Sequence, residues 1–181
     1  GRDYGYSVAV DASGNVYTTG EFNSTVDFDP GSGTANLTSN GGHDVFVLKL
    51  DSSGDYVWAK NFGNNFSDRS KSVAVDSSGN VHVAGTFSGT VDFDPGEGTA
   101  NLTSNGSVDV FVSKLDSSGD YVWAKNLGGS SDDRGYSVAV DASGNVYTTG
   151  YFSGTVDFDP GSGTANLTAN RYRDVFVSKL D

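Results

Sequence analysis

The chain has 181 residues, a net charge of −12, and neither Cys nor Met. Without Cys there is no disulfide, thiol chemistry or Cys-based zinc site, and without Met we expect a processed chain or a piece of a longer one. The acidic balance argues against nucleic acid and anionic membranes as partners, and no apolar run is long enough for membrane insertion. The 25 Gly residues, with 12% aromatic residues, favour strands over helices and over disorder.

The sequence repeats with a period of 65 residues. Asp11-Ala12-Ser13-Gly14-Asn15 returns with little change at residues 76–80 and again at residues 141–145. Such a chain is built from like units, each too small to bury its own apolar face. We divide it into repeats at residues 1–65, 66–130 and 131–181, and the third repeat stops before its last expected strand.

Apolar runs in the first repeat predict four strands, at residues 6–11, 16–20, 44–51 and 56–61. The members of each pair are separated by a short turn that contains Gly, which predicts two hairpins. Asp11 and Asp51 begin these turns, where an Asp side chain bonds nearby backbone amides. No segment has the pattern of a helix.

An insert separates the two hairpins. Residues 24–31 alternate, with Val26 and Phe28 on one face and acidic residues on the other, until Pro30-Gly31 stops the run. Residues 34–38 are expected to pair back on it. The insert therefore predicts a short two-stranded excursion between the second and third strands.

These elements predict an all-β protein of three tandem repeats, each a four-stranded antiparallel blade of the propeller type. The strand at residues 44–51 is apolar on both faces, as in a sheet that lies between two other sheets. A compact three-fold fold of the trefoil type is the structural alternative. The missing third-repeat strand counts against it, because three-fold closure needs three complete repeats.

Two runs carry a resemblance to a known family. The run from Gly135 to Gly150 contains Ser-Val-Ala-Val-Asp followed by Gly-Asn-Val-Tyr, and the run from Asp109 to Gly119 is followed by Val122-Trp123. Both resemble the bacterial β-propeller repeat family called SBBP. The Thr-Val-Asp-Phe-Asp-Pro-Gly insert is similar to versions in large secreted proteins. The resemblance implies a propeller fold and an extracellular or cell-surface location, and it brings no catalytic motif.

Three blades are fewer than the four of the smallest closed propellers. The outer faces of the end blades are apolar, and the third blade lacks an edge partner, which invites pairing with another chain. Three arrangements satisfy these faces: a longer propeller, a ring of six blades from two chains, or a head-to-tail filament. We expect self-assembly or further repeats of a parent chain.

An Asp-x-Asp pair recurs in every insert. Its two side chains are expected on one strand face, about 6–7 Å apart, where they repel unless they are separated, hydrogen-bonded or bridged by a cation. Calcium accepts several oxygen ligands in flexible geometry. A solvated strand face that ends in an Asp-Pro-Gly turn is the simpler interpretation. The candidate calcium ligands are Asp27, Asp29, Asp92, Asp94, Asp157 and Asp159.

Other positions suggest surface contacts. Asn36, Asn101 and Asn166 begin Asn-Leu-Thr sequons, which are candidate glycosylation sites in a secreted chain. Arg171-Tyr172-Arg173 stands where the first repeat has residues 41–43, and it introduces two cations and an aromatic ring into an acidic chain. These three residues are a candidate contact for a partner.

Trp58 and Trp123 are consistent with a sugar-stacking platform, but an aromatic residue on each outer strand is more simply explained by packing between blades. Glu21 also deviates from its counterparts, Thr86 and Tyr151.

No nucleophile motif accompanies either histidine, His43 or His82, and the same Asp residues are copied in every repeat, so we predict that the chain is not an enzyme. The favoured function is an extracellular structural or interaction scaffold. The alternative is a propeller module that binds carbohydrate or protein, and it predicts one repeat with polar or aromatic residues of its own. A hydrolase that uses one carboxylate pair ranks third.

Overall fold

The computed structural model describes residues 1–181 and consists of 17 strands without a helix, so it contains no helix that crosses a membrane. The first sheet has four antiparallel strands in the order β1-β2-β5-β6. They are β1 (Tyr4–Val10), β2 (Val16–Phe22), β5 (Asp44–Leu50) and β6 (Tyr56–Phe62). The prediction of four-stranded antiparallel sheets with no helix is confirmed.

The second sheet repeats this order with β7 (Arg69–Val75), β8 (Val81–Phe87), β11 (Asp109–Leu115) and β12 (Tyr121–Leu127). The third sheet has three strands, β13 (Arg134–Val140), β14 (Val146–Phe152) and β17 (Asp174–Leu180), in the order β13-β14-β17. The incomplete third blade is therefore confirmed, and β17 is an edge strand.

Each insert forms a separate two-stranded hairpin, as predicted. The three hairpins are β3 (Thr25–Asp27) with β4 (Asn36–Thr38), β9 (Thr90–Asp92) with β10 (Asn101–Thr103), and β15 (Thr155–Asp157) with β16 (Asn166–Thr168). The first strand is shorter than its alternation suggested. The amides of Asp29 and Ala35 both donate to Asp27 Oδ1, at 3.1 and 2.8 Å, and this turns the chain out of the strand.

The hairpin turns are closed by their first residue. Asp11 Oδ1 accepts hydrogen bonds from the amides of Ser13 (2.9 Å) and Asn15 (3.0 Å), and Gly14 takes a φ of 84° that suits Gly. The same bonds recur at Asp51, Asp76, Asp116 and Asp141. The turn-capping role predicted for these aspartates is confirmed.

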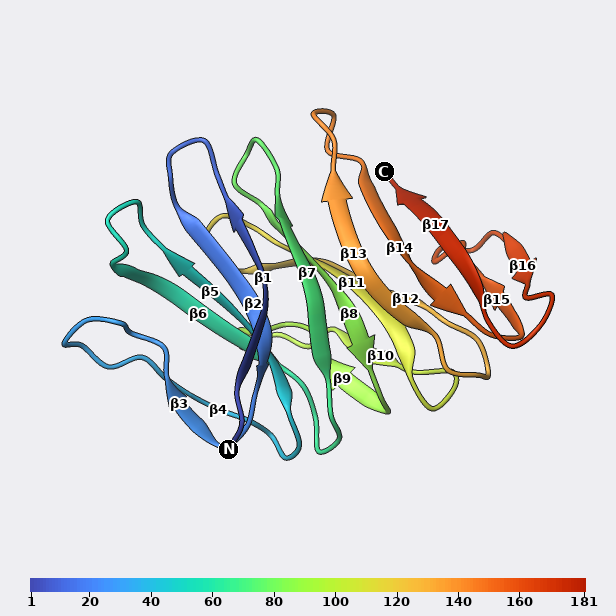
Figure 1. Cartoon of the computed structure of the whole chain (residues 1–181), viewed down its shortest axis with the longest axis horizontal. Coiled ribbons are helices and arrows are strands. Elements are labelled where there is room, and N and C mark those ends of the chain that lie inside the picture. Colours follow the sequence, from blue (N-terminus) through green and yellow to red (C-terminus); the bar gives the residue numbers. More distant parts are fainter.

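The three sheets follow one another along the chain, with the first strands β1, β7 and β13 side by side (Figure 1). A buried cluster joins the first two sheets through residues such as Val45, Val47 and Val73. Trp58 is buried in it, and its indole N–H donates to the carbonyl of Ser117 in the second sheet at 3.2 Å. Trp58 therefore packs between blades.

Each end of the stack leaves an apolar face without a neighbour. Val8 on β1 is 64% exposed, although its counterparts Val73 and Val138, which face the preceding sheet, are only 6% exposed. At the other end, Val175 and Val177 are each 74% exposed. The residues equivalent to them in the first two sheets are fully buried, namely Val45, Val47, Val110 and Val112. The stack thus ends in two unlike half-interfaces.

Glycine permits the close approach of the segment that leads to each following sheet. A Cβ on Gly41 would lie 2.5 Å from the Cα of Asn65, and a Cβ on Gly106 would lie 2.4 Å from the carbonyl oxygen of Ser131. The third repeat has Arg171 at this position. The third repeat thus carries a side chain at a position where the first two carry none.

This contact gives a direct test. Gly106→Arg, which copies the third repeat into the second, is expected to lower the free energy of unfolding by about 1–3 kcal/mol, because the added side chain overpacks the junction. Urea unfolding measures the change. Glu97→Ser, which copies the other repeats at an exposed loop, is the control and should change stability by less than about 0.5 kcal/mol. Equal effects of the two substitutions would contradict the close-approach argument.

Candidate functional site

The paired aspartates of the inserts hold their own hairpins. Asp27 accepts the two amide bonds described above, and Asp29 Oδ1 accepts the Gly31 amide at 2.7 Å. The Ala35 amide lowers the pKa of Asp27. The second and third inserts contain the same bonds. The structure contains no group of three or more acidic or histidine side chains arranged to hold a metal ion, and calcium binding stays a prediction.

The other predicted sites lie on the surface. Asn36, Asn101 and Asn166 are exposed at the start of the second strand of each insert hairpin, and their glycosylation stays a prediction. Tyr172 is almost fully exposed, and the Arg173 guanidinium lies 4.3 Å from the centre of the Tyr151 ring. Arg171 is also exposed, and these three residues therefore remain available to a partner.

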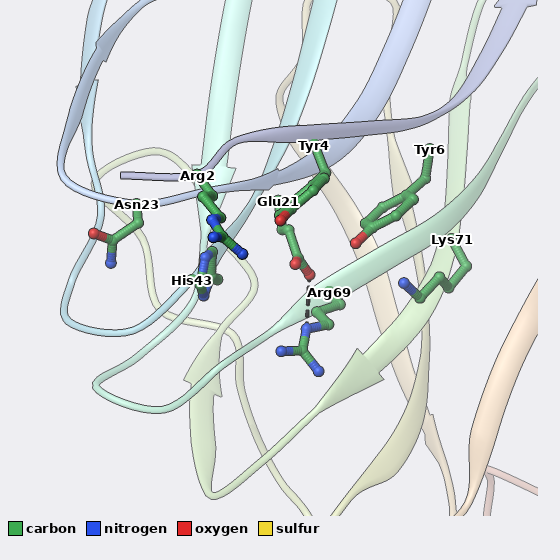
Figure 2. A pocket seen from close by; sticks show the side chains of 8 residues that line it. All are labelled: Arg2, Tyr4, Tyr6, Glu21, Asn23, His43, Arg69 and Lys71. Carbon is green, nitrogen blue, oxygen red and sulfur yellow. Dashed lines mark ion pairs between the residues drawn. The ribbon is translucent and has the colours of Figure 1, made fainter.

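A cavity of about 530 Å³ lies where the first and second sheets meet. The first repeat contributes Arg2, Tyr4, Tyr6, Glu21, Asn23 and His43, and β7 contributes Arg69 and Lys71 (Figure 2). The cavity thus combines basic side chains with two tyrosines in a strongly acidic chain. The sequence analysis did not group these residues.

An ion pair forms the floor of this cavity. Glu21 is buried, and its Oε2 lies 2.8 Å from Nε of Arg69, so the two sheets are joined by a charged contact (Figure 2). Tyr4 stands opposite Glu21 in the β1–β2 register. The register shifts between Gly5 and Ser7, and such a bulge re-aims the side chains of its strand.

The two tyrosines form an exposed aromatic surface. The rings of Tyr4 and Tyr6 are stacked with centroids 6.1 Å apart and planes 12° apart, and each residue is 41% exposed. The Lys71 ammonium lies 3.6 Å from the centre of the Tyr6 ring, a cation–π distance. Burial lowers the pKa of Lys71, and burial together with the nearby Glu21 carboxylate raises the pKa of Tyr6.

Most of the cavity residues stand at positions where the other repeats have a different residue type, and only Tyr6 and Arg69 recur, as Tyr136 and Arg134. Every one of the eight occupies a position at which the three copies differ, although most of the repeat is copied unchanged. Glu21, for example, is replaced by Thr86 and Tyr151, and His43 by Val108 and Arg173. The signal was therefore present in the sequence, but only the fold brings these positions together.

Buried carboxylates form a second set that the sequence analysis missed. Asp68 accepts hydrogen bonds from the amides of Asn64 (2.9 Å) and Ser88 (3.0 Å), and it thereby ties the linker to the second sheet. Burial raises the pKa of Asp68 to about 6. Asp133 repeats the arrangement with Gly129 and Ser153. Their role is structural, because backbone amides take both carboxylate oxygens.

Comparison with known proteins gives results that agree with this architecture. An uncharacterized WD repeat-containing protein of Acanthamoeba polyphaga mimivirus is 29% identical over 96% of the chain, and Regulatory protein FlaEY of Caulobacter vibrioides is 31% identical over 84%. The chain spans only 14% and 16% of the lengths of these relatives. The family model described as SBBP, Beta-propeller repeat, matches residues 1–28 and 122–152. The chain is thus similar to SBBP β-propeller repeats in these two segments, and the 65-residue period and the stacked four-stranded sheets agree with that similarity.

Proposed function

We propose that the chain is an extracellular interaction scaffold that extends by stacking blade on blade, and that each open face receives another blade of the same kind. For the isolated chain this blade belongs to a second copy. The resemblance to repeats of secreted proteins and the net charge of −12 support the location. The mechanism is geometric, since binding repeats a contact that the fold already makes twice.

The match between the two open faces carries this proposal. The face of β1 with Val8 and Val10 corresponds to the face of β7 that the first sheet covers. The face of β17 with Val175 and Val177 corresponds to the face of β5 that does the covering. The two open faces are therefore equivalent to two faces that pack against each other inside the stack. Burial of these valines contributes roughly 1.5–3 kcal/mol per fully buried side chain.

The C-terminal face also offers backbone groups. In the first two sheets β5 and β11 pair on both sides, whereas β17 pairs only with β14. An open cavity of about 570 Å³, with Trp123, Phe158 and Leu180 among its lining residues, adjoins this edge. A strand from a second copy would add hydrogen bonds there as well as apolar contacts.

Two face-specific variants test head-to-tail stacking. Val8→Asp removes the first face and Val177→Asp removes the second, because either change would bury an unpaired carboxylate. We expect the unmodified chain to associate and each variant alone to be monomeric by light scattering. An equimolar mixture should give a dimer with one chain of each kind, since each variant retains the face that the other lacks.

Other outcomes would overturn the proposal. If the unmodified chain is monomeric at 100 μM, its dissociation constant for self-association is roughly millimolar or weaker. That result would exclude a second copy as the occupant of the open faces. Self-association of Val8→Asp alone would show that the contact joins two like faces. Val57→Asp, at an exposed valine on β6, is the control and should leave association unchanged.

A second function, ligand binding, is favoured by one specific observation. Most residues that line the cavity at the first junction have no residue of the same type at the equivalent positions of the other repeats; the exceptions are Tyr6 and Arg69, which recur as Tyr136 and Arg134. A binding module of this fold needs such a departure from the repeat, and a purely structural stack does not.

A further inference from the structure

We propose that the cavity between the first and second sheets binds an acidic saccharide, with a sugar ring on Tyr4 and Tyr6 and its carboxylates held by Arg2 at one end of the cavity and Lys71 at the other (Figure 2). This inference is independent of stacking, because every residue that lines the cavity belongs to one chain. It rests on the charge, the aromatic surface and the polarity of the cavity.

The charge balance favours an anion. Arg2, Arg69 and Lys71 line the cavity together with a single carboxylate, that of Glu21, in a chain whose 23 acidic residues outnumber 11 basic ones. Glu21 is already paired with Arg69, and neither Arg2 nor Lys71 forms an ion pair. Two cations are therefore left without a counter-charge, and an arginine guanidinium matches a carboxylate with two parallel hydrogen bonds.

The aromatic surface favours a ring with an apolar face. Tyr4 and Tyr6 lie nearly parallel and remain accessible, so their faces are not used to fill a core. Figure 2 shows both rings extending from the same strand, with the Lys71 side chain approaching Tyr6 from the other sheet. A sugar that packs its C–H face on this surface places an acidic substituent within reach of the ammonium.

The polar lining favours a hydrated ligand. Only two of the eight lining residues are hydrophobic, and both are tyrosines, which carry a hydroxyl. Asn23 donates to the carbonyls of Gly41 (3.2 Å) and Gly42 (2.7 Å) and so fixes the loop that presents His43. The volume lies within the range of small-molecule sites. An apolar ligand would leave these polar groups unpaired.

The second junction provides an internal comparison. The positions of Glu21, Asn23 and His43 are occupied there by Thr86, Ser88 and Val108. None of the four cavities of the molecule is formed by these residues. The site therefore belongs to one junction, which distinguishes it from features that recur because the repeat is copied.

Titration of the ¹⁵N-labelled chain with trigalacturonate, followed by NMR, tests the proposal. We expect saturable shifts at Tyr4, Tyr6 and Lys71, and at least tenfold weaker binding of the neutral trisaccharide galactotriose. Tyr6→Ala and Lys71→Gln should each weaken trigalacturonate binding at least tenfold, and Lys71→Arg should restore most of it. Tyr136→Ala, at the equivalent position of the third repeat, is the matched control and should bind like the unmodified chain.

Three results would overturn the proposal. Equal binding of the neutral sugar would exclude recognition of the carboxylate. Inorganic phosphate or a glutamate-rich peptide that binds as tightly as trigalacturonate would exclude a saccharide as the class of ligand. No saturable shift at 10 mM trigalacturonate would exclude the site. The titration is repeated with the Val177→Asp variant, which is expected to be monomeric. Saccharide binding is thereby measured separately from self-association.

Discussion

Phe93→Ala is expected to lower the free energy of unfolding by about 3–5 kcal/mol. Phe93 is fully buried at the base of the second insert. Its ring lies 5.1 Å from Phe62 of the first sheet and 5.5 and 5.1 Å from Phe87 and Phe111 of its own sheet, measured between centroids. Truncation removes an aromatic ring from the contact between two sheets and leaves a cavity, and urea unfolding at constant pH measures the loss.

Phe28→Ala is the matched control, because Phe28 occupies the same position in the first insert. It contacts Phe22 (5.3 Å) and Phe46 (4.8 Å) of its own sheet, but no earlier sheet covers it, and it is only partly buried. We expect about half the loss found for Phe93→Ala, since the cost follows the contacts removed. Equal losses would show that the contact with Phe62 contributes nothing to stability.

Stability is expected to fall as the pH rises from about 4 to about 7. Burial raises the pKa of Asp68 to about 6, and it also raises the pKa values of Asp44, Asp109 and Asp133. Unfolded Asp loses its proton near pH 4. Between these values the folded chain binds more protons than the unfolded chain, so its stability decreases with pH. Asp68 alone contributes at most about 3 kcal/mol to this decrease.

Below pH 4 the trend reverses. The Asn145 side chain holds the pKa of Asp141 at about 2, and the Asn15 side chain lowers the pKa of Asp11, so protonation of these turn residues destabilises the fold. Unfolding free energies from pH 2 to 8 should therefore peak near pH 4. Asp68→Asn removes one buried titration and should flatten the decline between pH 4 and 7. A stability that rises across that interval would contradict the assignment.

The features that the sequence predicted are those with local causes. The Asp-x-Ser-Gly turns were predictable because Asp11 and Gly14 act on their own neighbours, and the stacking of sheets followed from strands that are apolar on both faces. The first insert strand was predicted too long because its alternation runs on to Phe28. The side chain of Asp27 ends that strand by accepting hydrogen bonds from backbone amides, and the alternation of apolar and polar residues does not predict such bonds.

The cavity was beyond such reasoning for a different physical reason. Glu21 and Arg69 belong to different repeats, and they meet only because the second sheet packs on the first. The bulge between Gly5 and Ser7, which affects where Tyr4 and Tyr6 point, leaves no clear mark in the sequence. Departures from the repeat did mark Glu21 and His43. Comparing the copies position by position marks residues such as Glu21 and His43, but it does not show that they lie beside Arg69 and Lys71 of the second repeat.

The two open faces differ in one further respect. β17 is an edge strand only because its sheet has no counterpart of β6 and β12, whereas β1 lies at the edge of its sheet as β7 and β13 do in theirs. Any assembly built through these faces has a direction, because every chain in it points the same way. If the assembly does not close into a ring, its two ends will therefore gain and lose subunits at different rates. A modification or ligand that blocks one end will stop growth there and leave the other end active.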